Sequence, residues 1–232
     1  MGTIGIIGAM DVEIEGILAQ MTDSTIEKSG SFVFTTGRLG GKDIVVVKCR
    51  IGKVNAAMCA TALLAKYDVA AVINLGVAGA AADVLNIGDV VISKDLVQHD
   101  VDAQPYYAPG QVPGMAIRFA ANAALAALAE TSCRRVFAGL DNKAYVATVA
   151  TGDVFVHHRD IKERIAANFG AYCIEMEGAA IAHVCQLMDI PFVAIRAISD
   201  KAEGGANVDF EQFVVTSAAF SAKIVVDMME NL

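Results

Sequence analysis

The 232-residue chain contains no tryptophan and only four prolines, and its 18 lysines and arginines are outnumbered by 26 acidic residues. The net charge of −8 argues against a surface that binds nucleic acid or an anionic membrane, because such a surface needs clustered basic residues. No uninterrupted apolar run approaches the ~18 residues that a membrane-spanning helix requires. We therefore expect a small-molecule partner, with neither nucleic acid nor a membrane bound.

Sequence signatures of disulfides, metals and common cofactors are also missing. The five cysteines are odd in number and include no C-x-x-C pair, and the four histidines share no metal-ligand spacing with them. G-x-G-x-x-G, P-loop and G-x-S-x-G motifs are absent. No lysine or arginine precedes Lys28, so the first residues lack the basic region of a signal peptide. These absences predict a cytoplasmic protein with reduced thiols and with no metal or cofactor.

Hydrophobic periodicity predicts strands that alternate with helices. We expect buried strands at residues 3–8, 70–75, 89–97, 145–151 and 192–198, and a hairpin at residues 31–38 and 42–49. Helices are expected at residues 9–20, 53–67, 117–131, 158–169 and 177–188, and from an N-cap at Asp209 nearly to the end. This order predicts a single α/β domain over residues 1–232, with a central mixed, mostly parallel sheet flanked by helices.

Several notable segments fall at predicted strand ends, where ligands bind in parallel α/β sheets. They are residues 8–10, 76–79, 151–153 and 199–200. Carboxylates in apolar surroundings lie near them: Glu13 in the first turn of a helix, Glu175 and Glu177 after a short strand, and Asp200 after a buried strand. Arg196 interrupts that last strand, and a buried arginine requires a partner, which the nearby acids can supply.

These segments together resemble the 5′-methylthioadenosine/S-adenosylhomocysteine nucleosidases, within the wider purine nucleoside phosphorylase superfamily. The resemblance spans essentially the whole chain and implies a nucleoside phosphorylase-like fold. It also implies hydrolysis of the N-glycosidic bond of an adenine nucleoside with an apolar 5′-thio group. The matching segments are IGIIGAM (4–10), IGKV (51–54), GVAG (76–79), His99-Asp100, TGDVF (151–155), EME (175–177) and RAISD (196–200).

The resemblance implies roles for three acids. Glu13 would be the general base that activates water, and Asp200 would be the general acid that protonates the departing adenine. Asp200 must then hold a proton near neutral pH, which requires surroundings that raise its pKa. Glu177 would accept hydrogen bonds from the ribose hydroxyls, and its charge would favour the positively charged sugar.

Other residues are implied to contact the substrate. Phe155 would stack on the adenine, the Val156 backbone would read its edge, and Met176 would pack against the ribose. Arg196 and Ser199 would orient the water and the acid. The remaining members of the expected site are Val77 and Glu175, together with Met10, Ile51 and Phe210 in the 5′ pocket.

The chain departs from the family pattern in two places. Typical members carry a serine where Val77 stands, near the water and the sugar, so water positioning must depend more on Glu13 and Arg196. The loop at residues 102–114 is about one residue short compared with the family, and Tyr106 replaces a phenylalanine there. In the family this loop reaches into the partner subunit's site. We therefore expect a homodimer, and the 55% content of hydrophobic residues agrees with that expectation.

Alternative functions remain open at this point. A nucleoside phosphorylase would use phosphate instead of water, and Arg50 and Arg196 could bind it, although Glu13 would repel it. Aminodeoxyfutalosine of a menaquinone route shares the adenine and ribose and is another possible substrate. A non-catalytic relative that stores nitrogen or senses nucleosides is disfavoured, because such a protein could lose its carboxylates and this chain retains Glu13, Glu177 and Asp200.

Overall fold

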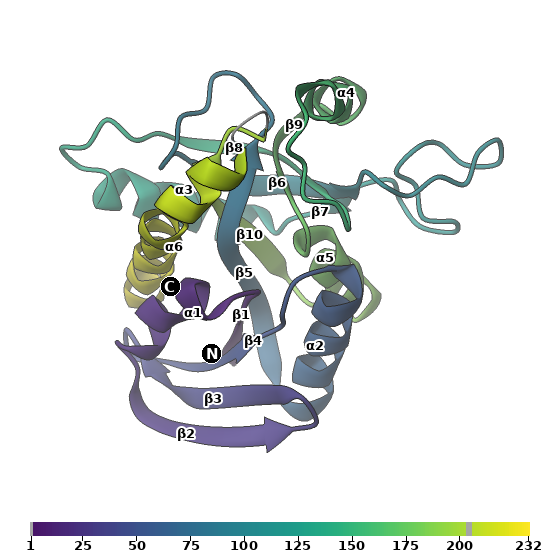
Figure 1. Cartoon of the computed structure of the whole chain (residues 1–232). Helices are drawn as coiled ribbons and strands as arrows, with labels where there is room; N and C mark the ends of the chain where they lie inside the picture. The colour runs from purple at the N-terminus through teal and green to yellow at the C-terminus, as the bar shows by residue number, and fades with distance from the viewer. Residues whose placement is uncertain (1, 203–205) are drawn as a thin grey trace.

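The computed structural model describes residues 2–202 and 206–232, and it describes the side chains of all of these except residues 206–209. Ten strands form one sheet (Figure 1): β1 (Thr3–Gly8), β2 (Thr22–Ser29), β3 (Phe32–Leu39), β4 (Lys42–Lys48), β5 (Val69–Ala80), β6 (Val90–Gln98), β7 (Phe119–Ala120), β8 (Ala144–Thr151), β9 (Ala171–Glu175) and β10 (Phe192–Asp200). The helices in the described residues are α1 (Asp11–Leu18), α2 (Lys53–Lys66), α3 (Ala123–Val136), α4 (Arg159–Phe169), α5 (Gly178–Leu187) and α6 (Ala206–Asn231).

The sheet is mixed. Its strands follow the order β10-β6-β8-β9-β5-β1-β4-β3-β2, with β7 paired to β6 and an additional pairing of β10 with β5. Among the strand pairings of the described residues, five are parallel and five are antiparallel. The prediction of a mixed sheet flanked by helices is confirmed. The five antiparallel pairings are those of the meander β2–β3–β4, of β6 with β7 and β10, and of β5 with β9, so parallel pairings make up half of the total.

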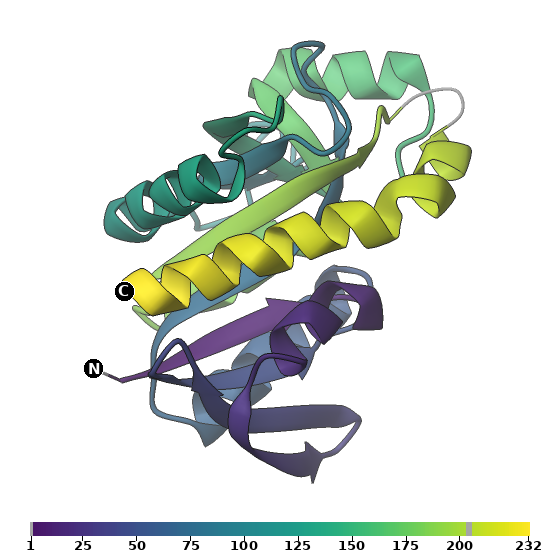
Figure 2. The ribbon, with the colours of Figure 1, turned by 90° about the vertical axis from the view of Figure 1, so that its left-hand side faces the viewer.

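Helices cover both faces of the sheet (Figures 1 and 2). Helices α1, α3 and α6 pack against one face, where Ile6 and Ile73 point. Helices α2 and α5 pack against the other face, where their neighbours Ile7 and Val72 point. Successive residues of a strand alternate between faces, so each central strand supplies both layers of the core.

Helix α6 supplies much of the first of these layers. Its segment Phe210–Asn231 is long and apolar enough, by length and composition alone, to cross a membrane. The helix packs against α1, α3, β5 and β10 (Figure 2), and it buries Ile224, Val225 and Met228 completely. These three buried side chains belong to the core of this fold.

Two helices begin more than two residues away from their predicted starts. Helix α3 begins at Ala123 rather than at residue 117, because the Asn122 side chain caps it by accepting the N–H groups of its second and third residues, each at 3.1 Å. Helix α6 begins at Ala206, so Asp209 lies in its first turn and is not its N-cap. The segment from Ala206 to Asp209 contains neither glycine nor proline, so its sequence is compatible with a helix that begins before Asp209.

Three strands also differ from the prediction, and one of them, the two-residue β7, lies within the helix predicted at residues 117–131. Strand β5 does not end near Gly76 but continues to Ala80, because Gly76, Val77 and Ala78 stay paired with β10. Strand β2 has no counterpart in the prediction. All of its side chains are exposed, and among the described strands it pairs only with β3 at the sheet edge, so its sequence needs no alternation of polar and apolar residues.

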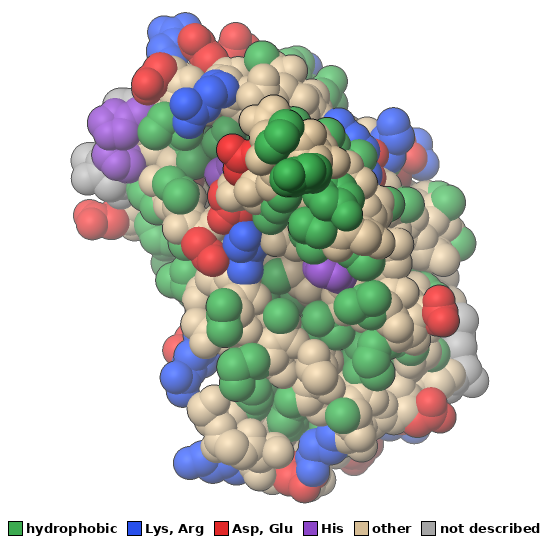
Figure 3. Space-filling view, turned by 90° about the vertical axis from the view of Figure 1, so that its right-hand side faces the viewer, with side chains coloured by type: hydrophobic (Ala, Val, Ile, Leu, Met, Phe, Trp, Pro, Cys, Tyr) green, Lys and Arg blue, Asp and Glu red, His purple; other side chains and the backbone are tan. Residues whose placement is uncertain are grey.

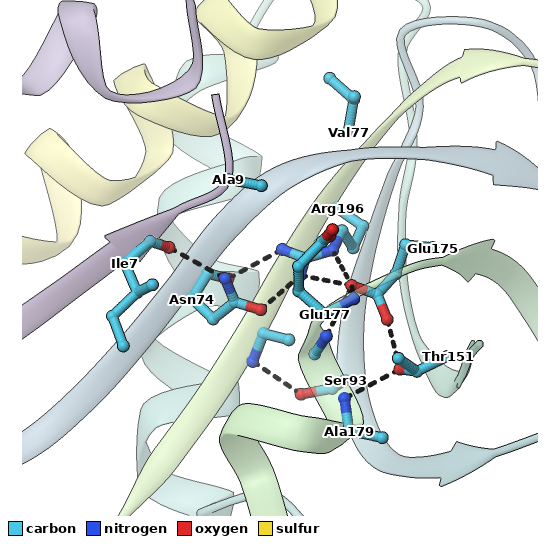
Figure 4. Close-up of polar contacts among 12 residues, drawn as sticks. Ile7, Ala9, Asn74, Val77, Ser93, Thr151, Glu175, Glu177, Ala179 and Arg196 are labelled. Carbon is cyan, nitrogen blue, oxygen red and sulfur yellow. Dashed lines mark hydrogen bonds and ion pairs between the residues drawn. The ribbon is translucent and has the colours of Figure 1, made fainter. Parts of the chain in front are cut away.

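Buried polar side chains join the strands at the centre of the sheet (Figure 4). The predicted acidic partner of Arg196 is Glu175: Nη2 lies 2.7 Å from Oε2, and both side chains are 2% exposed. Arg196 also donates to both oxygens of Asn74, whose Nδ2 donates to the Ile7 carbonyl at 2.9 Å. The other Glu175 oxygen accepts a hydrogen bond from Thr151. This network connects β1, β5, β8, β9 and β10.

The Glu175→Gln substitution should strongly destabilise the protein. The amide removes the negative charge that balances Arg196, and breaking a buried pair in this way typically costs about 3–5 kcal/mol. Glu27→Gln is the matched control, because Glu27 pairs with Lys66 at the surface. Urea unfolding should show a lower midpoint for Glu175→Gln and an unchanged midpoint for Glu27→Gln. Equal midpoints for wild type and Glu175→Gln would contradict this role of the pair.

Candidate active site

A cleft lies at the sheet edge where β1, β9 and β10 end, and it encloses about 610 Å³ of space that is partly open to solvent. Twelve of the fourteen residues predicted for the site line it. They come from the β1–α1 connection (Met10), α1 (Glu13), the residues before α2 (Ile51), β5 (Val77), the loop after β8 (Phe155, Val156), the end of β9 and the connection to α5 (Glu175, Met176, Glu177), β10 (Ser199, Asp200) and α6 (Phe210). The two exceptions are Arg196 and Tyr106.

Arg196 lies behind the cleft wall. Its guanidinium makes five hydrogen bonds, to Glu175, to Asn74 and to the Ile195 carbonyl, and a guanidinium has five N–H groups. The expectation that Arg196 orients the water and the acid is therefore not supported by its placement. Burial has left this side chain no N–H group directed at the cleft, and it holds Glu175 instead.

Tyr106 lies on the loop between β6 and β7, which projects from the molecule (Figure 1). Its side chain is 87% exposed and does not line the cleft of its own chain. The sequence-based expectation assigns it to the partner subunit's site, so contact of Tyr106 with a ligand stays a prediction.

Glu13 points into the cleft from the first turn of α1 and is buried. One carboxylate oxygen accepts the N–H groups of Ala9 at 2.6 Å and Met10 at 2.9 Å, and the other accepts that of Val77 at 3.0 Å. Burial raises the pKa of Glu13, while the charge of Arg196 and these three N–H groups oppose the rise. An oriented carboxylate with a raised pKa is suited to accept a proton from water.

Val77 therefore contacts Glu13 through its backbone, a contact that any residue other than proline could make. Its side chain contributes apolar surface to the cleft. The valine at this position keeps the backbone contact that orients Glu13, and it presents methyl groups where a serine would present a hydroxyl.

Glu177 is the residue that precedes α5, and its Oε1 accepts the N–H of Gly52 at 2.8 Å. Burial and then the negative charge of Glu175 raise the pKa of Glu177, while the Gly52 N–H and Arg196 act in the opposite direction. Burial is the largest of these effects, so the surroundings of Glu177 disfavour its ionised form. A positive charge placed beside Glu177 would be stabilised.

Asp200 ends β10 and is buried. Its Oδ1 accepts the Ala202 N–H at 2.8 Å, and its Oδ2 lies 3.0 Å from Ser199 Oγ. The Ser199 hydroxyl can donate to Asp200 or, alternatively, to the Ala78 carbonyl at 3.5 Å. Since a hydroxyl both donates and accepts, Ser199 can contact Asp200 in either protonation state.

Aromatic rings form one wall of the cleft. Phe155 and Phe210 meet edge to face with their centroids 5.9 Å apart, and His157 stacks on Phe155 at 6.4 Å. Phe155 is 43% exposed. A partly exposed ring at a cleft is suited to stack on a planar heterocycle.

Sequence reasoning did not assign six residues that line the cleft: Ala9, Ala78, Gly79, Val154, Ile174 and Ala202. It also missed two polar residues behind the cleft, Asn74 and Thr151. Asn74 stands alone among the apolar residues 70–75, and a buried amide needs hydrogen-bond partners, so this isolation was a usable signal. Thr151 attracts notice in the sequence only as a strand end, although its hydroxyl bridges Glu175 and the Ala179 N–H. Val154 lines the cleft but carries no chemical signal that separates it from other valines.

Comparison with known sequences identifies close relatives. The profile of the phosphorylase superfamily matches residues 3–230. The 5′-methylthioadenosine/S-adenosylhomocysteine nucleosidase of Anoxybacillus flavithermus is 42% identical over 231 residues, which cover 99% of this chain and 98% of that protein. The nucleosidase of the same name from Oceanobacillus iheyensis is 40% identical over 233 residues, which cover 99% of this chain and 100% of that protein.

Solved structures agree with the sequence comparison. The nucleosidase of Neisseria meningitidis in complex with methylthio-immucillin-A has a TM-score of 0.95 and 38% identity, with both chains covered completely. The futalosine hydrolase of Helicobacter pylori has a TM-score of 0.93 and 36% identity, covering 100% of this chain and 98% of that chain. The chain therefore belongs to the phosphorylase superfamily and, within it, to the 5′-methylthioadenosine/S-adenosylhomocysteine nucleosidase family.

Proposed function

We propose that this protein hydrolyses the N-glycosidic bond of 5′-methylthioadenosine and S-adenosylhomocysteine, releasing adenine and a 5′-thioribose. The observation that carries the proposal is the placement of Glu13, Glu177 and Asp200 around one cleft whose other walls are largely apolar. Relatives that are 40% and 42% identical bear the name of this activity.

The three acids divide the reaction between them. Cleavage leaves positive charge on the ribose and sends the bonding electrons to the adenine. Asp200 protonates the departing adenine, and Glu13 takes a proton from the water that bonds to the anomeric carbon. Glu177 accepts hydrogen bonds from the ribose hydroxyls and stabilises the positive sugar.

Contacts with the rest of the substrate follow from the lining of the cleft. Phe155 stacks on the adenine, the Val156 backbone reads its edge, and Met176 packs on the ribose. Ser199 orients Asp200, and Arg196 acts through Glu175 without touching the substrate. The 5′-thio group lies among the apolar side chains of Met10, Ile51 and Phe210.

The structural similarity to a futalosine hydrolase supports a second substrate, aminodeoxyfutalosine. It shares the adenine and the ribose, so the same acids could cleave it. Phosphorolysis is less suited to this cleft. Glu13 would repel phosphate, and the N–H groups of Arg196 are already bonded within the protein.

We further propose that residues 1–232 act as a single nucleosidase domain, in the cytoplasm and in methionine salvage. The continuous sheet supports one domain. The net charge of −8 supports the absence of nucleic-acid and membrane partners.

A homodimer is part of the same proposal. Ile51, Val54 and Met58 form an apolar stripe at helical spacing along the start of α2, and they are 52%, 70% and 57% exposed. Figure 3 shows hydrophobic side chains spread over this side of the molecule, which also carries α5 and the projecting loop. Ile51 lines the cleft as well, so a second copy seated on the stripe would reach the cleft mouth. Tyr106 of the partner subunit could then close the 5′ pocket.

The protein should release adenine and a free sugar from methylthioadenosine in buffer without phosphate, as chromatography of the products would show. Asp200→Asn should lower kcat by about 10²- to 10⁴-fold, because an amide cannot protonate the leaving group. Asp227→Asn, which breaks a surface pair with Arg135, is the control and should leave kcat unchanged. A requirement for phosphate with formation of a sugar 1-phosphate, or near-normal activity of Asp200→Asn, would refute this mechanism.

The 5′ pocket should favour methylthioadenosine over adenosine and exclude adenosine monophosphate. Burial of the methylthio group is worth a few kcal/mol at most, so kcat/KM should favour methylthioadenosine by about tenfold or more. A 5′-phosphate among apolar side chains would lose its hydration without compensation. Measured kcat/KM values for the three nucleosides test this ranking. Equal values for adenosine and methylthioadenosine would show that the pocket has been misassigned.

The Met58→Glu substitution should separate the dimer, because it places a charge in the apolar stripe. Ile26→Glu is the control, since Ile26 is 71% exposed on the edge strand β2, outside the stripe. Light scattering should give twice the chain mass for wild type and Ile26→Glu, and the chain mass for Met58→Glu. KM for methylthioadenosine should rise in Met58→Glu, because the partner's Tyr106 is lost. A fully active wild-type monomer at micromolar concentration would contradict the dimer.

A further inference from the structure

Three residues outside the cleft lining form a closed ring of hydrogen bonds. Asp100, two residues beyond β6, accepts from Lys53 Nζ through Oδ1 at 2.6 Å and from the Asp153 N–H through Oδ2 at 2.9 Å. The Asp153 carboxylate in turn accepts the backbone N–H of Lys53 at 2.8 Å. Each member of this Lys53–Asp100–Asp153 ring therefore contacts both of the others.

The ring joins the two sides of the cleft. Lys53 directly follows Gly52, whose N–H donates to Glu177 Oε1 at 2.8 Å. Asp153 lies two residues before Phe155, in the loop after β8 that lines the cleft. The ring therefore fixes the segment that orients Glu177 relative to the loop proposed to hold the nucleobase.

The ring is firmer than an ordinary surface ion pair. The side chains of Lys53 and Asp100 are only 17% and 23% exposed, and Lys53 Nζ has a second acceptor in Gln98 Oε1 at 3.2 Å. Burial acts to raise the pKa of Asp100, but the hydrogen bonds from Lys53 and from the Asp153 N–H hold it below its usual range. Asp100 therefore stays ionised at neutral pH, and its pair with Lys53 persists.

We propose that Lys53, Asp100 and Asp153 are positioning residues that hold the nucleobase loop in register with Glu177, an inference that rests on the proposed nucleosidase function. None of the three lines the cleft. Without the ring, the contacts to the base and to the ribose would loosen together. Both the nucleoside and free adenine should then bind more weakly.

Asp100→Asn, Lys53→Met and the double variant test this inference. Lys66→Met and Glu27→Gln are matched controls, because they break a pair of the same length, 2.6 Å, at the other end of α2. The measurements are kcat and KM for methylthioadenosine and the inhibition constant of adenine. We expect each ring variant to raise KM and the adenine constant by about tenfold, as for a small misplacement of binding groups. The double variant should raise KM and the adenine constant no further than the more impaired single variant does, because both changes break the same ring.

Several results would overturn the inference. The inference fails if the ring variants have KM and adenine constants within about twofold of wild type. It also fails if the fold-increases of the two single variants multiply in the double variant. A lower kcat with unchanged KM would indicate less active protein and would also refute positioning. If wild type itself failed to hydrolyse methylthioadenosine, the proposed function would fall instead. Calorimetric titration with adenine would then still decide whether the ring holds the base loop, because weaker binding by Asp100→Asn supports it and equal binding overturns it.

Discussion

The ion pair between Arg196 and Glu175 determines where Glu177 lies in the cleft. An unbalanced charge inside the sheet would be very costly, so Arg196 must sit among acceptors from the neighbouring strands. Glu175 balances it and has capacity left to accept the N–H groups of Glu177 at 3.1 Å and Gly178 at 2.7 Å. These two residues lead into α5, so the position of Glu177 in the cleft follows from the buried pair. The interaction therefore serves the fold and the site at once.

Much of the site could be predicted from the sequence, because its acids follow buried strands. The apolar runs that form β1 and β10 are recognisable, and the carboxyl ends of parallel strands meet at one edge. This rule alone predicts that Glu13 and Asp200 lie near each other, and both line the cleft. The acidic partner of Arg196 was predictable for a similar reason, since a buried guanidinium needs one.

The remaining features depend on contacts between distant residues. Asn74 bonds to Ile7, 67 residues away, and Lys53 reaches Asp100, 47 residues away. No local pattern specifies such a partner. The placement of Arg196 behind the wall, and not on it, likewise depends on which strands are neighbours in the sheet. The exposed edge strand β2 was missed because no buried face imposes a pattern on it.

The surplus of buried acids over buried bases in the cleft connects the architecture to the proposed chemistry. Burial raises the pKa values of Glu13 and Glu177 in the cleft, so ionising them opposes folding. Their contribution to stability is complete below the usual carboxyl pKa and is lost as the pH rises through the raised values. A positively charged ribose acts against burial, because it stabilises the ionised forms of both side chains and lowers their pKa values. Binding of such a sugar releases protons and strengthens as the pH rises. In the free enzyme, burial makes the ionised forms of Glu13 and Glu177 unfavourable. The positive charge that develops on the ribose during cleavage stabilises these ionised forms, and they stabilise it in turn.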